Sequence, residues 1–156
     1  MIIRIEKDKH RCNKIIPIIK LNTIEGYVLF NDNFEYNILK QEDTNKLVGL
    51  SDSYFHHINS IRIGWRWSLK ENKIEIMSIL YRNSKRYIEH FCFIDEVDMY
   101  FKFKIVVTKN TYELSFGDCD KTIIRENNWV LPRYVLFPYF GGSTVAPKDF
   151  IFNMEF

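Results

Sequence analysis

The stretch Ser60-Ile-Arg-Ile-Gly-Trp-Arg-Trp-Ser68 decides the fold class, because its apolar and polar side chains alternate along the chain. In an extended strand, successive side chains point to opposite faces of the sheet. The isoleucines and tryptophans of this stretch therefore share one face, while Arg62, Gly64 and Arg66 share the other. We expect Trp65 and Trp67 to be core residues. The period of two predicts a half-buried β-strand.

Similar alternation recurs on both sides of this stretch. Residues 74–81 and 86–93 follow it across short polar turns, which predicts a three-stranded antiparallel meander. A second hairpin is expected from residues 101–107 and 111–116, closed by residues 117–120. The tail predicts a last strand with one apolar face, made by Phe150, Phe152, Met154 and Phe156. Residues 15–21 are expected to be irregular or to form an edge segment, because Pro17 lacks the N–H that a central strand needs.

Short strands at this spacing are typical of an all-β, antiparallel two-sheet β-sandwich of the jelly-roll or concanavalin-like type. A closed β-barrel is the alternative, since periodicity does not separate the two. The 156 residues fit a single domain, residues 1–156. An apolar share of 46% and an aromatic share of 16% supply a core that needs neither metal nor disulfide.

Composition argues against several classes of function. The formal net charge is +2, and Lys and Arg are scattered along the chain, so nucleic-acid binding is not expected. The first ten residues carry charges and do not resemble a secretory signal, and no run reaches the about 18 apolar residues of a membrane span. We therefore expect a cytoplasmic protein that is not integral to a membrane. Three widely spaced cysteines predict free thiols in a reducing compartment, with no cofactor or metal site.

The polar face of the first strand offers the best candidate binding residues. Arg62 and Arg66 are expected to project together, with Gly64 between them leaving room for a ligand. Such guanidinium groups bind carboxylates, phosphates or sugar hydroxyls. His56 and His57 precede the strand in a segment that could present one imidazole beside the arginines. The alternative is that the arginines are solvated or paired with carboxylates, and that the histidines bond to backbone in a turn.

Aromatic residues could add stacking surfaces for sugar rings. Trp129 lies in the polar stretch 126–130 and is the tryptophan that we expect to be exposed. Tyr139 precedes Gly141 and Gly142, which are expected to shape a tight connection between the last two strands. This glycine pair lacks the Gly-Lys-Ser/Thr ending of a phosphate-binding loop. Tyr139 is nevertheless a candidate to lie beside the binding site.

Two stretches carry a family resemblance. Residues 56–66 and 138–149 resemble small, uncharacterised β-sandwich proteins of Bacteroidota and their phages, which implies a jelly-roll-like fold and carries no known activity. His57, Asn59 and Arg62 resemble the His-x-Asn-x-Arg strand motif of galectins, except that Arg62 follows one position late and would face the other way. The Arg-x-Glu-Leu-Arg and Gln-Ile/Val-His strands of alginate-lyase-type jelly rolls are absent.

Three functions are consistent with these observations. The leading hypothesis is a non-catalytic binding module that recognises a glycan or small anionic ligand on one sheet face. The second is a phage or virion structural domain, or a protein-interaction domain, in which the same side chains contact a protein partner or a second copy. It would then be virion-associated. The third is a polysaccharide-lyase-like enzyme, in which His57 or Tyr139 is the base and an arginine neutralises a uronate carboxylate.

Overall fold

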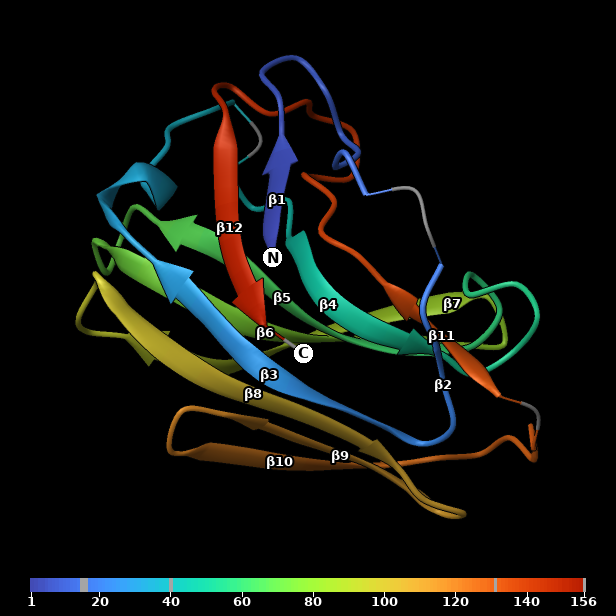
Figure 1. The fold of residues 1–156 in the computed structure, drawn as a ribbon. Coiled ribbons are helices and arrows are strands. Elements are labelled where there is room, and N and C mark those ends of the chain that lie inside the picture. Colours follow the sequence, from blue (N-terminus) through green and yellow to red (C-terminus); the bar gives the residue numbers. More distant parts are fainter. Residues whose placement is uncertain (15–16, 40, 131, 156) are drawn as a thin grey trace.

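The computed structural model describes residues 1–14, 17–39, 41–130 and 132–155. These residues form twelve strands and one short 3-10 turn, η1 (Asp32–Phe34). The strands make two antiparallel six-stranded sheets that pack face to face (Figure 1). The described part of the chain contains no helix with the length and apolarity needed to cross a membrane.

The first sheet has the strand order β1-β12-β3-β8-β9-β10 and the second the order β2-β11-β4-β5-β6-β7. The strands of the first sheet are β1 (Ile2–Ile5), β12 (Phe150–Glu155), β3 (Thr23–Phe30), β8 (Met99–Val107), β9 (Thr111–Phe116) and β10 (Cys119–Ile124). Those of the second are β2 (Ile19–Lys20), β11 (Arg133–Leu136), β4 (Asn45–Ser51), β5 (Ser60–Ser68), β6 (Lys73–Arg82) and β7 (Lys85–Ile94).

The predicted sandwich is confirmed, and the closed barrel is wrong, because each sheet keeps its own two edge strands. The meander β5-β6-β7 and the hairpin β8-β9 lie where alternation placed them. Trp65 and Trp67 face the core, as expected. The ring of Trp65 is fully buried and makes edge contacts with Phe34 and Phe150 at 5.0 and 5.3 Å between centroids.

Some elements differ from the expectations. Residues 119–124 form β10 instead of simply closing a hairpin, because their side chains alternate against β9. The connection from β11 to β12 is not tight: it runs over residues 137–149 and packs against the segment before β4. Ile19–Lys20 is an edge strand beyond Pro17, while residues 15–16 and the predicted core residue Phe156 lie outside the described residues.

All three cysteines are free thiols. Cys92 on β7 and Cys119 on β10 line a common hollow between the edges of the two sheets, where Cys119 is a neighbouring thiol of Cys92. Burial, followed by this neighbouring thiol, raises the pKa of Cys92 to about 12. Cys92 is therefore a protonated thiol at neutral pH.

Candidate ligand-binding site

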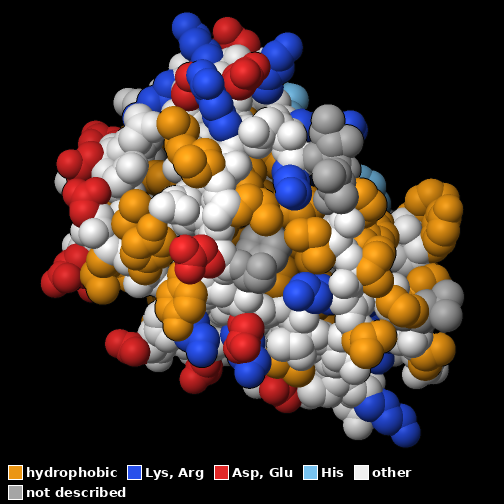
Figure 2. Space-filling view, in the orientation of Figure 1, with side chains coloured by type: hydrophobic (Ala, Val, Ile, Leu, Met, Phe, Trp, Pro, Cys, Tyr) orange, Lys and Arg blue, Asp and Glu red, His pale blue; other side chains and the backbone are white. Residues whose placement is uncertain are grey.

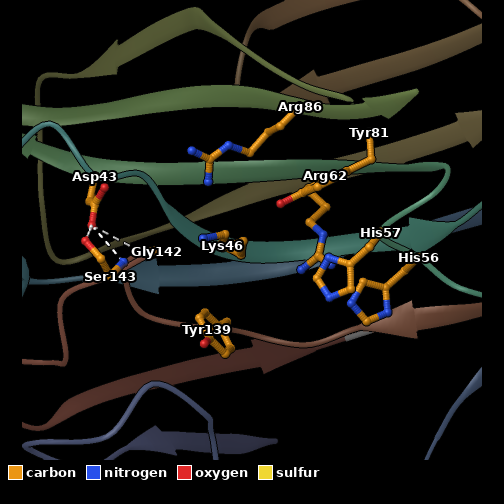
Figure 3. Close-up of a pocket in the computed structure, with 10 residues that line it drawn as sticks. All are labelled: Asp43, Lys46, His56, His57, Arg62, Tyr81, Arg86, Tyr139, Gly142 and Ser143. Carbon is orange, nitrogen blue, oxygen red and sulfur yellow. Dashed lines mark hydrogen bonds between the residues drawn. The ribbon is translucent and has the colours of Figure 1, made fainter. Parts of the chain in front are cut away.

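A groove runs over the outer face of the second sheet, on the side away from the core. It consists of two adjoining hollows of about 410 and 500 Å³, which share His56, His57, Arg62 and Tyr139. We call these two hollows together the cationic groove. The first hollow is also lined by Asp43, Lys46, Tyr81, Arg86, Gly142 and Ser143 (Figure 3), and the second by Arg11, Cys12, Lys14, Tyr134, Val135, Leu136, Phe137 and Pro138.

Strand register explains why these side chains meet. Ile61 and Ile63 point into the core, so Arg62 between them must point outward. Arg62 lies opposite Gly49 of the neighbouring strand β4, and Lys46 lies opposite Gly64. A Cβ atom at position 49 would stand 2.5 Å from Cγ of Arg62. The missing side chain therefore lets the stem of Arg62 lie across β4 along the floor of the groove.

Arg62 is a buried cation without a described partner. The residue is only 7% exposed, and its Nε is buried with no hydrogen-bond acceptor. No described carboxylate lies within ion-pairing distance of its guanidinium, which points toward the ring of His57 in Figure 3. Burial lowers the pKa of Arg62 to about 10, so the side chain still carries its charge at neutral pH.

Lys46 places a second buried cation in the groove. Its Nζ donates a hydrogen bond of 2.5 Å to the carbonyl of Gly141 and lies 5.3 Å from the centre of the Tyr139 ring. Burial lowers the pKa of Lys46 to about 8, and repulsion from Arg62 and Arg86 acts in the same direction. The groove is therefore an environment that disfavours added positive charge.

Asp43 is the one carboxylate among the described lining residues of the groove. Its Oδ2 accepts hydrogen bonds from the backbone N–H groups of Gly142 and Ser143 at 3.3 and 3.1 Å. Arg86 extends from β7 toward this loop (Figure 3). Asp43 therefore fixes the loop that forms one wall of the groove.

The two histidines sit at the opposite end of the first hollow, with ring centres 4.1 Å apart. His56 is half-buried, and its Nδ1 lies 3.1 Å from the hydroxyl of Tyr134. Burial, with repulsion from Arg62, lowers the pKa of His56 to about 4 and that of the exposed His57 below its usual range. Both imidazoles are therefore neutral at pH 7 and offer hydrogen bonds more than charge.

Arg62 and Arg66 share the outer face of the sheet, as predicted, but the structure does not bring them together in one site. Arg66 points from the same sheet face, but its Nε forms a 2.6 Å ion pair with Glu75, which also contacts His90 Nδ1 at 2.8 Å. Four residues along a strand span about 13 Å, so one small anion does not reach both guanidinium groups. Arg66 lines neither hollow of the groove.

Asn59 and Trp129 also lie away from the groove. Asn59 is buried, and its side-chain oxygen accepts a hydrogen bond from the backbone of Asn83, so it fixes the loop between β4 and β5. Trp129 is half-buried and lines a separate hollow of about 480 Å³. Lys46, Tyr81 and Arg86 belong to the groove but escaped sequence reasoning, because only the pairing of strands brings them beside Arg62.

A second arginine cluster, which sequence reasoning also missed, lies where the two sheets meet. Asp52 is fully buried and accepts hydrogen bonds from Arg125 Nε and Arg133 Nη2, each at 2.7 Å. Tyr112 and Asn127 donate to the same carboxylate at 2.5 and 2.6 Å. Burial acts to raise the pKa of Asp52, but these hydrogen bonds outweigh it and hold the pKa below its usual range. We call these five residues the Asp52 cluster.

No protein-family model and no curated protein matches the chain. Solved structures do match its fold. LamAcat from Zobellia galactanivorans is 12% identical with a TM-score of 0.62, covering 98% of this chain and 74% of that one. A GH16 protein from Bacteroides ovatus, in complex with a mixed-linkage glucan product, is 10% identical with a TM-score of 0.59. The match covers 98% of this chain and 76% of that one. A galactohydrolase whose name contains galactose-4-sulfate is 8% identical with a TM-score of 0.50. The match covers 98% of this chain and 75% of that one.

Proposed function

We propose that the protein is a non-catalytic binding module that holds an acidic glycan, carrying sulfate or carboxylate groups, in the cationic groove. The observation that carries the proposal is the position of Arg62. Its guanidinium is buried at the floor of an open groove, and its Nε has no partner among the described residues. Five cationic side chains line the groove against one carboxylate: Arg11, Lys14, Lys46, Arg62 and Arg86.

An anion in the groove would offset the electrostatic cost of burying these cations. A buried charge without a partner is destabilising by several kcal/mol, and removing water strengthens its attraction to an anion. Sulfate and carboxylate groups accept paired hydrogen bonds from a guanidinium. Because Lys46 and Arg62 are desolvated by the fold itself, less water has to be removed when the ligand arrives.

Three features favour a glycan over a small free anion. The groove is open and extends over two hollows, which is more room than a single sulfate fills. The rings of Tyr81 and His57 line it beside the cations and can pack against sugar faces. The sandwiches with similar folds include one in complex with a mixed-linkage glucan product and a galactohydrolase whose name contains galactose-4-sulfate.

Binding is favoured over hydrolysis by the composition of the groove. Most glycoside hydrolases use two carboxyl groups on either side of the scissile bond. Among the described lining residues, Asp43 is the one carboxylate, and it holds the backbone of Gly142 and Ser143. The groove therefore lacks the pair that this reaction requires.

One observation favours a second function, β-elimination on a uronate polymer. His57 and Tyr139 line the groove together with Arg62. An arginine that neutralises the carboxylate acidifies the adjacent C–H; a base takes that proton, the glycosidic C–O bond breaks, a C=C bond forms, and the departing oxygen is protonated. An unsaturated product, detected by its ultraviolet absorbance, would distinguish this reaction from binding alone.

Isothermal titration calorimetry tests the proposed function. Oligosaccharides of a sulfated galactan, a polyuronate and a neutral glucan are titrated into the wild-type protein and into Arg62→Met. We expect at least one acidic series to bind, the neutral series to bind more weakly, and Arg62→Met to reduce acidic affinity at least about tenfold. Arg4→Met, which removes a half-exposed arginine on β1 of the other sheet, is the control and should bind like wild type. Equal affinity for acidic and neutral chains would overturn the proposal.

A further inference from the structure

The loop between β4 and β5 carries an aromatic tip that the fold leaves in solvent. Tyr54 is 74% exposed and Phe55 is 62% exposed, and their rings meet edge to face at 4.9 Å between centroids. Ile58 in the same loop is 40% exposed. Hydrophobic side chains protrude in Figure 2 at the right-hand end of the molecule, where Figure 1 places this loop.

This tip is exposed although its backbone is firmly held. The N–H of Asp52 donates to the carbonyl of Asn59, closing the base of the loop at 2.9 Å, and the N–H of Ile58 donates to the carbonyl of Phe55 at 2.9 Å. The hydroxyl of Ser53 donates to the Phe55 carbonyl at 2.6 Å. The two rings are therefore presented by an ordered turn, so a ligand that stacks on them orders little additional backbone.

The aromatic tip continues the cationic groove. His56, the next residue after Phe55, lines both hollows. Tyr134 lines the second hollow, and its hydroxyl contacts His56 Nδ1 at 3.1 Å and donates to the carbonyl of Tyr54 at 3.2 Å. A polymer that leaves the second hollow at His56 therefore meets Tyr54 and Phe55 next.

We infer that Tyr54 and Phe55 form a stacking platform for the same acidic glycan, so that the protein recognises a chain that extends past the groove. This inference rests on the proposed function. The loop from Ser53 to Asn59 contains no Lys, Arg, Asp or Glu, and its exposed rings match the apolar faces of sugars. The groove would then bind the anionic groups of the glycan, and the platform would add apolar contacts, which salt does not screen.

The test compares chain lengths. A disaccharide and an octasaccharide from whichever acidic polymer binds wild type are titrated into the double variant Tyr54→Ala/Phe55→Ala. Octasaccharide affinity should fall about tenfold, as expected for two lost stacking contacts, and disaccharide affinity should stay at the wild-type value. The steepness with which salt weakens octasaccharide binding should not change. Tyr27→Ala removes a 44% exposed tyrosine on the other sheet and should affect neither ligand.

The outcomes separate this inference from the proposed function. If Arg62→Met weakens both oligosaccharides while Tyr54→Ala/Phe55→Ala binds both like wild type, the platform is overturned and the groove remains. If the double variant instead dissociates an oligomer seen by light scattering, with oligosaccharide affinity unchanged, the tip is a protein contact and the inference is also overturned. If no acidic oligosaccharide binds the wild-type protein, both the proposed function and this inference are overturned.

Discussion

The Asp52 cluster and the cationic groove both bury arginines, but they differ in whether those arginines have a carboxylate partner. Asp52 receives Arg125 and Arg133 with both of its oxygens, whereas Arg62 has no described carboxylate to pair with. Burial of an arginine therefore does not by itself mark a ligand site. We propose that a buried arginine without a partner among the described residues, at the bottom of an open groove, does.

The two regions also differ in how they are built. The Asp52 cluster joins segments from both sheets, because Tyr112 comes from β9 of the first sheet while Arg133 begins β11 of the second. Its donors satisfy the carboxylate completely, which is the arrangement of a structural clamp. The groove lies on the outer face of one sheet, and its cations repel one another. Folding is favoured by the first region and opposed by the second.

The largest expected effect breaks the paired region. Asp52→Asn removes the charge that compensates Arg125 and Arg133, and we expect the free energy of unfolding in urea to fall by about 3 kcal/mol or more. Asp149→Asn is the control, because its ion pair with Arg4 is half-exposed on both sides and solvent screens it, so this variant should lose much less stability. Equal losses in the two variants would contradict the clamp.

The next effect has the opposite sign. Arg62→Met replaces an unpaired buried cation with an apolar chain of similar length, so the free energy of unfolding should stay constant or rise by about 1 kcal/mol. The same variant is expected to lose acidic-glycan binding. A loss of stability as large as that of Asp52→Asn would mean that Arg62 has a structural role and not a ligand-binding role.

A third effect concerns the pH dependence of the groove. The pKa of Lys46 is about 8 in the folded protein, against 10.5 ordinarily, so the unfolded chain binds more protons between these values. The contribution of Lys46 to the free energy of unfolding should therefore rise from about pH 8 to about pH 10.5. Acidic-glycan affinity should fall severalfold over the same range as Lys46 loses its charge.

Lys46→Met provides the matched control for this titration. Between about pH 8 and pH 9, where Arg62 with its pKa of about 10 is still charged, it should remove both the rise in stability and the loss of affinity, as measured by urea denaturation and calorimetry at each pH. His56 acts in a separate window: with its folded pKa lowered to about 4, its contribution to stability should fall as pH drops from about 6.5 to about 4. An alkaline response that persists in Lys46→Met would assign it to another group.

Local periodicity was sufficient to predict the sandwich and the outward direction of Arg62, because a period of two fixes which face a side chain takes. It could not predict partners. The ion pair of Arg66 with Glu75 depends on the register between β5 and β6, and the place of Lys46 depends on a bulge between β4 and β5. The Asp52 cluster brings together residues 60 to 81 positions apart, which no local pattern reveals.

Gly49 has a consequence for how selective the groove can be. Since the stem of Arg62 lies across the bare backbone at this position, its rotamer freedom is lost when the chain folds and not when a ligand arrives. A surface arginine swings out to meet whatever anion approaches, but this one is too constrained to do so. If the groove binds an acidic glycan as we propose, the ligand has to reach down to Arg62, and we expect chains whose charged groups project from the sugar ring to be preferred over bulky anions that stop at the rim.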